Sequence, residues 1–406
     1  MLYRELLTNE LNQRSEGFKS FADEQARDLS EYLEKLSRLC RKSYAEIASL
    51  FERAENIGAL PSEELDAAKN FAFSFDQTWA NHEEARRWAT SILENRTTFA
   101  ADGSQIYAEK EISLPVGAIQ IGWFENPHDA SQRYEKNAYF EVLSPKDLLE
   151  NQVEPMNPET RVGEKRFHAE IAKTKEFLLR KKGWQERGEK MPLAFFDNTL
   201  LISFSLPQTA LQESFLQAAV SLVRLSRETK VPLIGYVDRS FSRDLLHLLD
   251  AFDGGIKLTS EKQTLYDATI LNFETSNLRR ILKNWGDRTA FCYSKRKGLN
   301  AFIDLETDKS LVGFVYLQTT QDSAPARLDV PSWIYEQDFL DEVLDTVRAE
   351  CVIGLGYPYA LETADQTAVI TMRDREVFLS ALQGFAKENN LNFKVSRKSA
   401  SKGRRR

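Results

Sequence analysis

Two strand-like segments that each carry an aspartate constrain this chain more than any other feature. In residues 99–107, Asp102 follows a short apolar run and precedes Gly103. In residues 193–196, four consecutive apolar residues lead directly to Asp197. Such an apolar run is typical of a central strand buried on both faces, and a charge at its C-terminal end falls where open α/β sheets place their sites. The two segments therefore predict two carboxylates within one sheet.

A long helix is expected between these strands, from about residue 158 to residue 182. Its apolar stripe recurs at helical spacing and consists of Phe167, Ile171, Thr174 and Leu178. At about 100° per residue, Glu170 projects between Phe167 and Thr174. Glu170 is therefore the helix acid best directed at the sheet, and the alternative is a border glutamate with a surface contact.

Three clustered carboxylates repel one another unless a cation joins them. Hard oxygen ligands without cysteine favour Mg²⁺ or Mn²⁺ over zinc. Two such ions about 4 Å apart activate a water and stabilise the leaving oxygen of a phosphodiester. Asp102, Glu170 and Asp197 therefore predict a divalent-metal site, and the competing interpretation is that Asp102-Gly103 and Asp197-Asn198 simply form turns.

The order of the expected elements predicts an α/β fold with a mixed sheet flanked by helices. Three strands with short connections suggest an antiparallel meander. The later strand–helix–strand unit requires a parallel pairing. This order resembles that of ribonuclease-H-like (PIWI-like) nucleases. The expected strands are 99–107, 113–124, 137–143, 193–197 and 231–237, with helices at 158–182 and 208–229; further helices are expected near 241–251, 276–285, 336–350 and 373–389, and strands near 289–293 and 311–318.

A chain of 406 residues exceeds one average domain. Helical periodicity predicts that residues 1–96 form a helical hairpin or short coiled coil, in which Ser62 caps a helix running through Phe75. Residues 97–390 are expected to form the nuclease domain. Residues 391–406 are expected to be a disordered basic tail, because seven basic residues and no acid occur from position 394 onward in a chain of net charge −7.

Cysteine usage and hydropathy indicate the compartment. The three cysteines are far apart and form no Cys-x-x-Cys pair, which excludes a disulfide framework and a thiolate zinc site as leading ideas. The first residues lack the layout of a signal peptide, and no apolar run approaches the roughly 18 residues of a membrane span. We therefore expect a cytoplasmic protein without a membrane partner.

A glycine-rich segment near the C-terminus supplies a candidate fourth ligand. Residues 354–365 read Gly-Leu-Gly-Tyr-Pro-Tyr-Ala-Leu-Glu-Thr-Ala-Asp. A dinucleotide-binding loop is rejected because the third glycine and an immediately following helix are missing. The better description is a constrained turn that enters a helix bearing Asp365, with Glu362 as the competing acid.

Over roughly residues 95–390, the chain resembles the NurA family of DNA repair nucleases. The Asp-Gly-Ser strand, the helix glutamate, the second aspartate strand and the late Gly-Tyr-Pro…Ala-Asp segment occur in the order that this family uses. By position, the resemblance implies that Asp102, Glu170, Asp197 and Asp365 are catalytic metal ligands. It also assigns Tyr357 to the late active-site motif, as a nucleic-acid contact.

Two positions depart from the family pattern. The second strand usually reads Asp-Gly-Ser-Leu in the family, whereas residues 197–200 read Asp-Asn-Thr-Leu, which keeps the acid but makes the backbone beside it less permissive. Archaeal members often carry histidine at the last ligand, so Asp365 is a bacterial-type choice.

The resemblance implies the activity and the partners. The implied activity is DNA cleavage that depends on two Mn²⁺ (or Mg²⁺) ions. It comprises 5′→3′ exonuclease and single-strand endonuclease activities, which act in end resection during double-strand break repair. The resemblance also implies a homodimer working with a HerA-type hexameric ATPase.

The sequence specifies the substrate contacts less closely than the metal ligands, and it leaves other functions open. Arg239 and Lys295 follow strand ends and are candidate phosphate contacts, with solvated surface charges as the alternative. Two other functions compete: a ribonuclease-H-like nuclease acting on RNA or RNA/DNA hybrids, and a non-catalytic DNA-binding adaptor of an ATPase ring. Four acids in one place favour catalysis, because a scaffold has no need of mutually repelling carboxylates.

Overall fold

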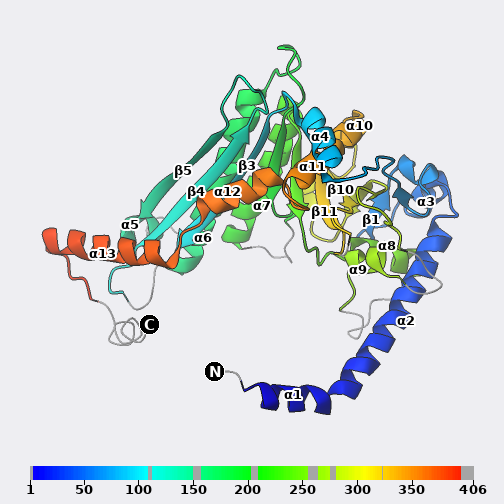
Figure 1. Ribbon diagram of the computed structural model, residues 1–406, viewed down its shortest axis with the longest axis horizontal. Coiled ribbons are helices and arrows are strands. Elements are labelled where there is room, and N and C mark those ends of the chain that lie inside the picture. The colour runs from blue at the N-terminus through cyan, green and yellow to red at the C-terminus, as the bar shows by residue number, and fades with distance from the viewer. Residues whose placement is uncertain are drawn as a thin grey trace. The chain divides into compact units, whose positions relative to one another are not determined.

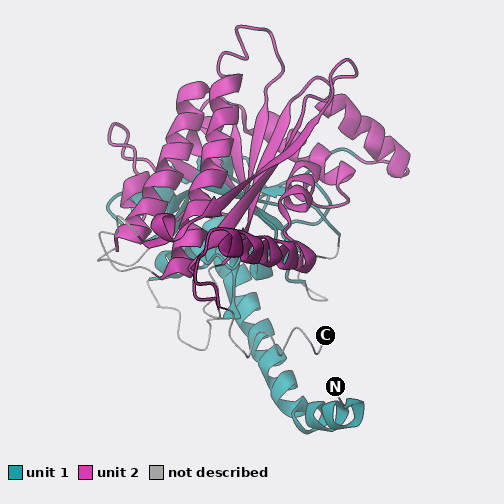
Figure 2. Cartoon of the chain, turned by 90° about the vertical axis from the view of Figure 1, so that its left-hand side faces the viewer, with its two compact units in different colours: residues 1–77, 237–297, 313–328 teal, residues 78–236, 298–312, 329–406 magenta. Residues whose placement is uncertain are grey.

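The computed structural model describes residues 3–107, 112–149, 157–202, 209–254, 264–274, 280–321 and 323–394. The chain packs into two compact units (Figure 2). Unit 1 comprises residues 1–77, 237–297 and 313–328, and unit 2 comprises residues 78–236, 298–312 and 329–406. These units are defined by packing, and the sequence-based modules 1–96, 97–390 and 391–406 stay a prediction. All four candidate acids belong to unit 2.

The sheet of unit 2 mixes antiparallel and parallel pairings. Strand β3 pairs antiparallel with β4, which pairs antiparallel with β5. On its other side β3 pairs parallel with β6, and β6 pairs parallel with β7. This arrangement confirms the expected α/β fold. The strands are β3 (Thr98–Ile106), β4 (Gly117–Asn126), β5 (Glu135–Leu143), β6 (Leu193–Asp197) and β7 (Leu233–Val237).

Helices of unit 2 cover both faces of this sheet (Figure 1). Helix α6 (Pro158–Lys181) begins with a proline in its first turn, and the Asn157 side chain accepts from the Glu159 N–H, two strong start signals. A Cβ on Gly103 would lie 2.8 Å from Cγ of Arg166, so α6 packs directly on that face. A Cβ on Gly122 would lie 2.5 Å from the Ala368 nitrogen, so α12 (Tyr359–Ala368) covers the opposite face. The other helices are α4 (His82–Leu93), α5 (Pro145–Leu149), α7 (Ala210–Thr229), α10 (Ser332–Glu336), α11 (Leu340–Ile353), α13 (Met372–Glu388) and the short η3 (Asn300–Phe302).

Unit 1 combines the N-terminal helices with small antiparallel strands. Helix α2 packs against α8 through an apolar core, and its Tyr32 hydroxyl donates to the Asp250 carboxylate at 2.9 Å. Strand β1 pairs with β9, β9 pairs with β10, and β2 pairs with β8, all antiparallel. The elements are α1 (Arg4–Gln13), α2 (Ser15–Leu39), α3 (Tyr44–Leu50), β1 (Gly58–Pro61), η1 (Glu63–Asp66), β2 (Ala72–Phe73), α8 (Asp244–Phe252), α9 (Asp267–Asn272), β8 (Arg288–Thr289) and β9 (Cys292–Lys295), with most of β10 (Val312–Leu317).

Two helices expected from the sequence are wrong. Ser62 caps only the short η1, because Asn70 and Phe71 adopt positive φ angles of 48° and 68° that a helix cannot continue through. Residues 280–285 of the helix expected near 276–285 are not helical, since the N–H groups of residues 283 and 284 donate to the Asp287 carboxylate. Three strands of the described residues were not expected: β11 (Ala326–Pro331), and β1 and β2, which lie in the segment predicted to be helical.

The C-terminal segment is described only in part. Lys394 exchanges hydrogen bonds with Ser113: its N–H donates to the Ser113 hydroxyl at 2.8 Å, and its carbonyl accepts from the Ser113 N–H at 3.0 Å. The remainder of the expected basic tail, residues 395–406, lies outside the described residues. Among the helices that are described, none combines the length and the apolar character needed to cross a membrane.

We predict that Gly122→Ala destabilises unit 2, because the new Cβ would press on the backbone of α12 at residues 367 and 368. Overpacking of this kind costs about 1–3 kcal/mol, which thermal unfolding would detect as a lower Tm. Gly163→Ala is the matched control: a Cβ there meets nothing within 4 Å, so better helix propensity should raise the Tm slightly. An unchanged Tm in Gly122→Ala would contradict the close packing of α12.

Candidate active site

The register between β3 and β6 brings two aspartates together. Ala101 pairs with Phe196 in parallel register, so the next residues, Asp102 and Asp197, are neighbours on adjacent strands. Side chains at paired positions point to the same face, and adjacent strands lie about 4.8 Å apart. The two carboxylates therefore share one face of the sheet. Strand β6 ends at Asp197, so the edge of β3 beyond this point has no β6 neighbour.

Helix α12 lies over the face that carries these aspartates. Asp102 on β3 pairs with Gly122 on β4. Because Gly122 has no side chain, α12 can approach the sheet closely at this position. On the same face, the Ile370 N–H donates to the Ser104 hydroxyl at 3.3 Å. The exposed Asp365 is carried by this helix. The late acid expected from the sequence therefore belongs to the element packed over Asp102.

A tight turn before α12 positions Tyr357. A Cβ on Gly354 would lie 2.0 Å from the Tyr357 carbonyl oxygen, and Gly356 has φ +111°, so both positions favour glycine. The Tyr357 hydroxyl donates to Oδ1 of Asp197 at 3.0 Å. Behind it, Oε2 of the buried Glu350 accepts from the Ala360 N–H at the start of α12. The turn thus links α12 to the second aspartate.

Glu170 reaches the sheet from the opposite face. Its side chain is buried at 3 % exposure on α6, which packs on the Gly103 side of the sheet. Nη1 of Arg166 donates both to the Gly103 carbonyl at 3.0 Å and to Oε2 of Glu170 at 2.9 Å. The helix acid is therefore directed at the sheet from the α6 side, where it is paired with Arg166.

The four acids influence one another electrostatically. Burial raises the pKa of Asp102 to about 6, and repulsion from Asp197 and Asp365 adds to this shift. The hydrogen bond from the Gly103 N–H acts in the opposite direction and lowers the pKa. Burial also raises the pKa of Glu170 to about 8, with added repulsion from Asp102 and Asp197 that Arg166 partly offsets. This region is therefore one in which negative charge is costly.

The donor chemistry of these residues suits a divalent cation. Their ligands are carboxylate oxygens, which Mg²⁺ and Mn²⁺ prefer, and their mutual repulsion is what a bound cation relieves. As the side chains stand, no three His, Cys, Asp or Glu residues in the described part of the chain are grouped closely enough to hold an ion. The site therefore fits such an ion in charge and donor type, and Asp102 and Asp197 share the face that is covered by α12, the helix that carries Asp365.

The expected phosphate contacts lie in the other unit. Arg239 is exposed just after β7, and Lys295 is the half-buried last residue of β9. Both belong to unit 1, whereas the acids belong to unit 2. Their role in DNA binding stays a prediction.

Two residues that support the site were missed from the sequence. Arg166 precedes Glu170 by four positions, and this spacing on a helix could have predicted their ion pair from the sequence. Asp329, fully buried in β11, accepts from the Leu200 N–H at 3.1 Å and from the Thr199 hydroxyl, and thereby holds the turn after Asp197. No sequence signal pointed to Asp329, because its strand was not expected.

Replacement of Asp329 by leucine should loosen the turn that follows Asp197. The Leu200 N–H would be left buried without this acceptor, at a cost of about 1–3 kcal/mol, and its amide hydrogen exchange should accelerate. Asp329→Asn keeps an acceptor oxygen and should lose less stability. Equal Tm and equal exchange at Leu200 in the leucine variant and the unmodified protein would show that this contact does not hold the turn.

Comparisons with known proteins identify the family and similar folds. The NurA domain model matches residues 96–370. The crystal structure of the NurA nuclease from Sulfolobus solfataricus is 10 % identical with a TM-score of 0.50, and the match covers 96 % of this chain and 98 % of that chain. At this identity the likeness concerns the fold alone.

Two further crystal structures are more distant. A structure of NurA is 10 % identical with a TM-score of 0.40, covering 72 % of this chain and 89 % of that chain. A structure of NurA bound to dAMP and manganese is 11 % identical with a TM-score of 0.31, covering 72 % and 88 %. No curated protein matches the sequence.

Proposed function

The chain belongs to the NurA family, whose domain model matches 275 of its 406 residues, and from this we propose that it is a metal-dependent DNA nuclease. The observation that carries the proposal is the in-register placement of Asp102 beside Asp197 under the helix that bears Asp365. Burial, together with repulsion from Asp197 and Asp365, raises the pKa of Asp102. A protein keeps such a costly arrangement where a cation is bound.

Each residue has a distinct role in this proposal. Asp102, Asp197 and Asp365 would hold the ion on the α12 face. The Tyr357 hydroxyl donates to Oδ1 of Asp197 and so fixes the orientation of that carboxylate. A divalent cation bound there supplies positive charge that lowers the pKa of a water and offsets charge on the phosphodiester. Glu170 would join from the α6 face through the open edge of β3.

The Arg166–Glu170 pair suggests a second role for α6. The Arg166 side chain is about a quarter exposed, and its guanidinium holds the Gly103 carbonyl and Glu170 together. A guanidinium suits phosphate as well as carboxylate. Arg166 would therefore fix the strand beside Asp102 in the free protein and be available to a DNA phosphate.

The finer features of the activity rest on the family resemblance. They comprise Mn²⁺ (or Mg²⁺) as the cofactor with two ions, 5′→3′ exonuclease and single-strand endonuclease activities, and end resection in double-strand break repair. They also comprise a homodimer, a HerA-type hexameric ATPase as partner, a cytoplasmic location, and Arg239, Lys295 and Tyr357 as DNA contacts.

A non-catalytic DNA-binding adaptor is the second candidate. It is favoured by one observation: no three acidic, histidine or cysteine side chains in the described ranges are grouped for metal binding. An adaptor would bind DNA with the same affinity in Mn²⁺ and in chelator and would cut it in neither.

Asp102→Asn should abolish cleavage of single-stranded DNA in Mn²⁺ while leaving the Tm unchanged or higher, because it removes a repelling charge without changing side-chain shape. We expect a loss of at least about a hundredfold, since the site loses a ligand. The measurement is cleavage of a labelled oligonucleotide in Mn²⁺, Mg²⁺ or chelator, together with calorimetric titration of Mn²⁺.

Two matched variants of α12 control this experiment. Glu362, whose carboxylate accepts from Gln366, should tolerate replacement by glutamine, whereas Asp365→Asn should impair both Mn²⁺ binding and cleavage. Full activity in Asp102→Asn would remove that residue from the site. An impaired Glu362→Gln with an active Asp365→Asn would exchange the roles of the two acids.

Removal of residues 395–406 should weaken DNA binding without affecting the fold, because Lys394 and its contacts with Ser113 are retained. Six basic residues are lost, so the slope of log affinity against log salt for single-stranded DNA should fall by up to about 4. Fluorescence anisotropy at several salt concentrations measures this slope. Identical slopes for the full and shortened chains would show that the tail does not contact DNA.

A further inference from the structure

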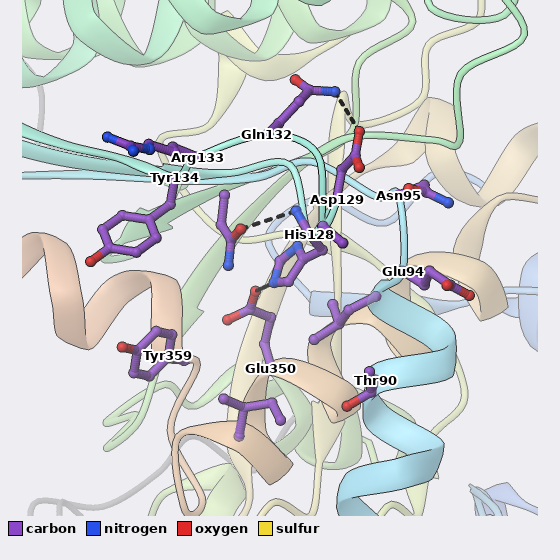
Figure 3. Close-up of a pocket in the computed structure, with 14 residues that line it drawn as sticks. Thr90, Glu94, Asn95, His128, Asp129, Gln132, Arg133, Tyr134, Glu350 and Tyr359 are labelled. Atoms are coloured by element: carbon purple, nitrogen blue, oxygen red, sulfur yellow. Dashed lines mark hydrogen bonds and ion pairs between the residues drawn. The ribbon is translucent and has the colours of Figure 1, made fainter.

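A cavity of about 1100 Å³ lies in unit 2, apart from the acidic residues of the candidate active site (Figure 3). The loop between β4 and β5 contributes one wall, and α4, α11 and the first residue of α12 contribute the others. The lining includes side chains with hydrogen-bonding groups and two tyrosines. No function described above uses this cavity.

The two tyrosines form an aromatic wall. Figure 3 shows Tyr134 and Tyr359 on one side of the cavity, with Asp129, Asn95 and Glu94 on the other. Tyr134 is 62 % exposed and Tyr359 is 39 % exposed, yet both rings contact the buried Phe124, with ring centroids 5.6 Å and 5.8 Å away. Exposed aromatic faces anchored on a buried ring offer a fixed stacking surface.

The opposite wall and the floor are polar and include three carboxylates. Nδ1 of His128 donates to the Arg96 carbonyl at 2.7 Å, and its Nε2 lies 3.7 Å from Oε1 of the buried Glu350. Glu94 and Asp129 add further carboxylates to the lining, and Arg133 supplies a cation. Carboxylates disfavour a phosphate inside the cavity, but they accept hydrogen bonds from an uncharged group that carries N–H donors.

The spacing along α12 relates this cavity to the candidate active site. Tyr359 and Asp365 lie six residues apart on one helix, which corresponds to about 9 Å along its axis. That length spans up to about three nucleotides at the 3.4 Å spacing of a stacked DNA strand. A strand with a phosphate at Asp102 and Asp365 would therefore have a nearby base within reach of the tyrosines.

We propose that this cavity binds an unstacked base of single-stranded DNA, one to three nucleotides from the phosphate held at the acidic residues. The base stacks on Tyr134, the more exposed of the two rings, its polar edge faces the acceptor-rich wall, and Arg133 neutralises a neighbouring phosphate. Stacking on aromatic side chains tolerates any base. This proposal rests on the proposed nuclease function, because it places the strand across the same site.

Tyr134→Ala tests the proposal, since this exposed loop residue can change without disturbing the core. The probes are a fluorescent twelve-residue oligodeoxythymidylate and an abasic strand of the same length, with binding measured by anisotropy in chelator at low salt so that neither is cut. We expect Tyr134→Ala to bind the thymidylate strand about tenfold more weakly and the abasic strand equally well. Tyr134→Phe keeps the ring and should bind both strands like the unmodified protein.

Tyr139→Ala is the matched control, because Tyr139 is 36 % exposed on β5 and does not line the cavity. Equal binding of the thymidylate strand by Tyr134→Ala and Tyr139→Ala would overturn the base-binding role. An equal loss of binding to the abasic strand would also overturn it, and so would a failure of the unmodified protein to bind either strand. Loss of cleavage in Asp102→Asn alongside unchanged binding by Tyr134→Ala would leave the nuclease proposal standing without this cavity.

Discussion

The parallel pairing of β3 with β6 is the interaction on which the rest of the candidate site depends. Its register sets Asp102 beside Asp197 on one face, and two like charges on adjacent strands in a partly buried position oppose folding. The structure offsets part of this cost locally. The Tyr357 hydroxyl donates to Asp197, and Arg166 provides a positive charge near Asp102. A bound cation would relieve the repulsion that remains between the two aspartates.

Glycine determines how closely α12 approaches these charges. Gly122 lets the helix backbone rest on β4, and Gly354 lets the preceding chain fold back on the Tyr357 carbonyl. A side chain at either position would displace the helix that carries Asp365. The same helix begins at Tyr359, in the wall of the large cavity. Two regions of proposed DNA contact are therefore positioned by one element.

The order of the elements in unit 2 was predictable, because β3 and β6 each contain an apolar run before the aspartate and α6 has a proline start and an asparagine cap. The neighbouring positions of Asp102 and Asp197 followed from that order. The face from which Glu170 approaches was not predictable, since periodicity identifies the buried side of a helix but not the side of the sheet it covers. Strand β11 was not predicted, because Arg327 and Asp329 interrupt its apolar pattern. Both side chains are buried and interact with residues distant in the sequence.

Anomalous diffraction from crystals soaked in Mn²⁺ tests the central claim most directly, because it locates the ion without relying on activity. The account predicts an anomalous peak on the α12 face, within coordination distance of Asp102 and Asp197, with the side chain of Asp365 turned toward it. A fully occupied crystal with a peak elsewhere, or with no peak between the two aspartates, would contradict the assignment of this face as the metal site.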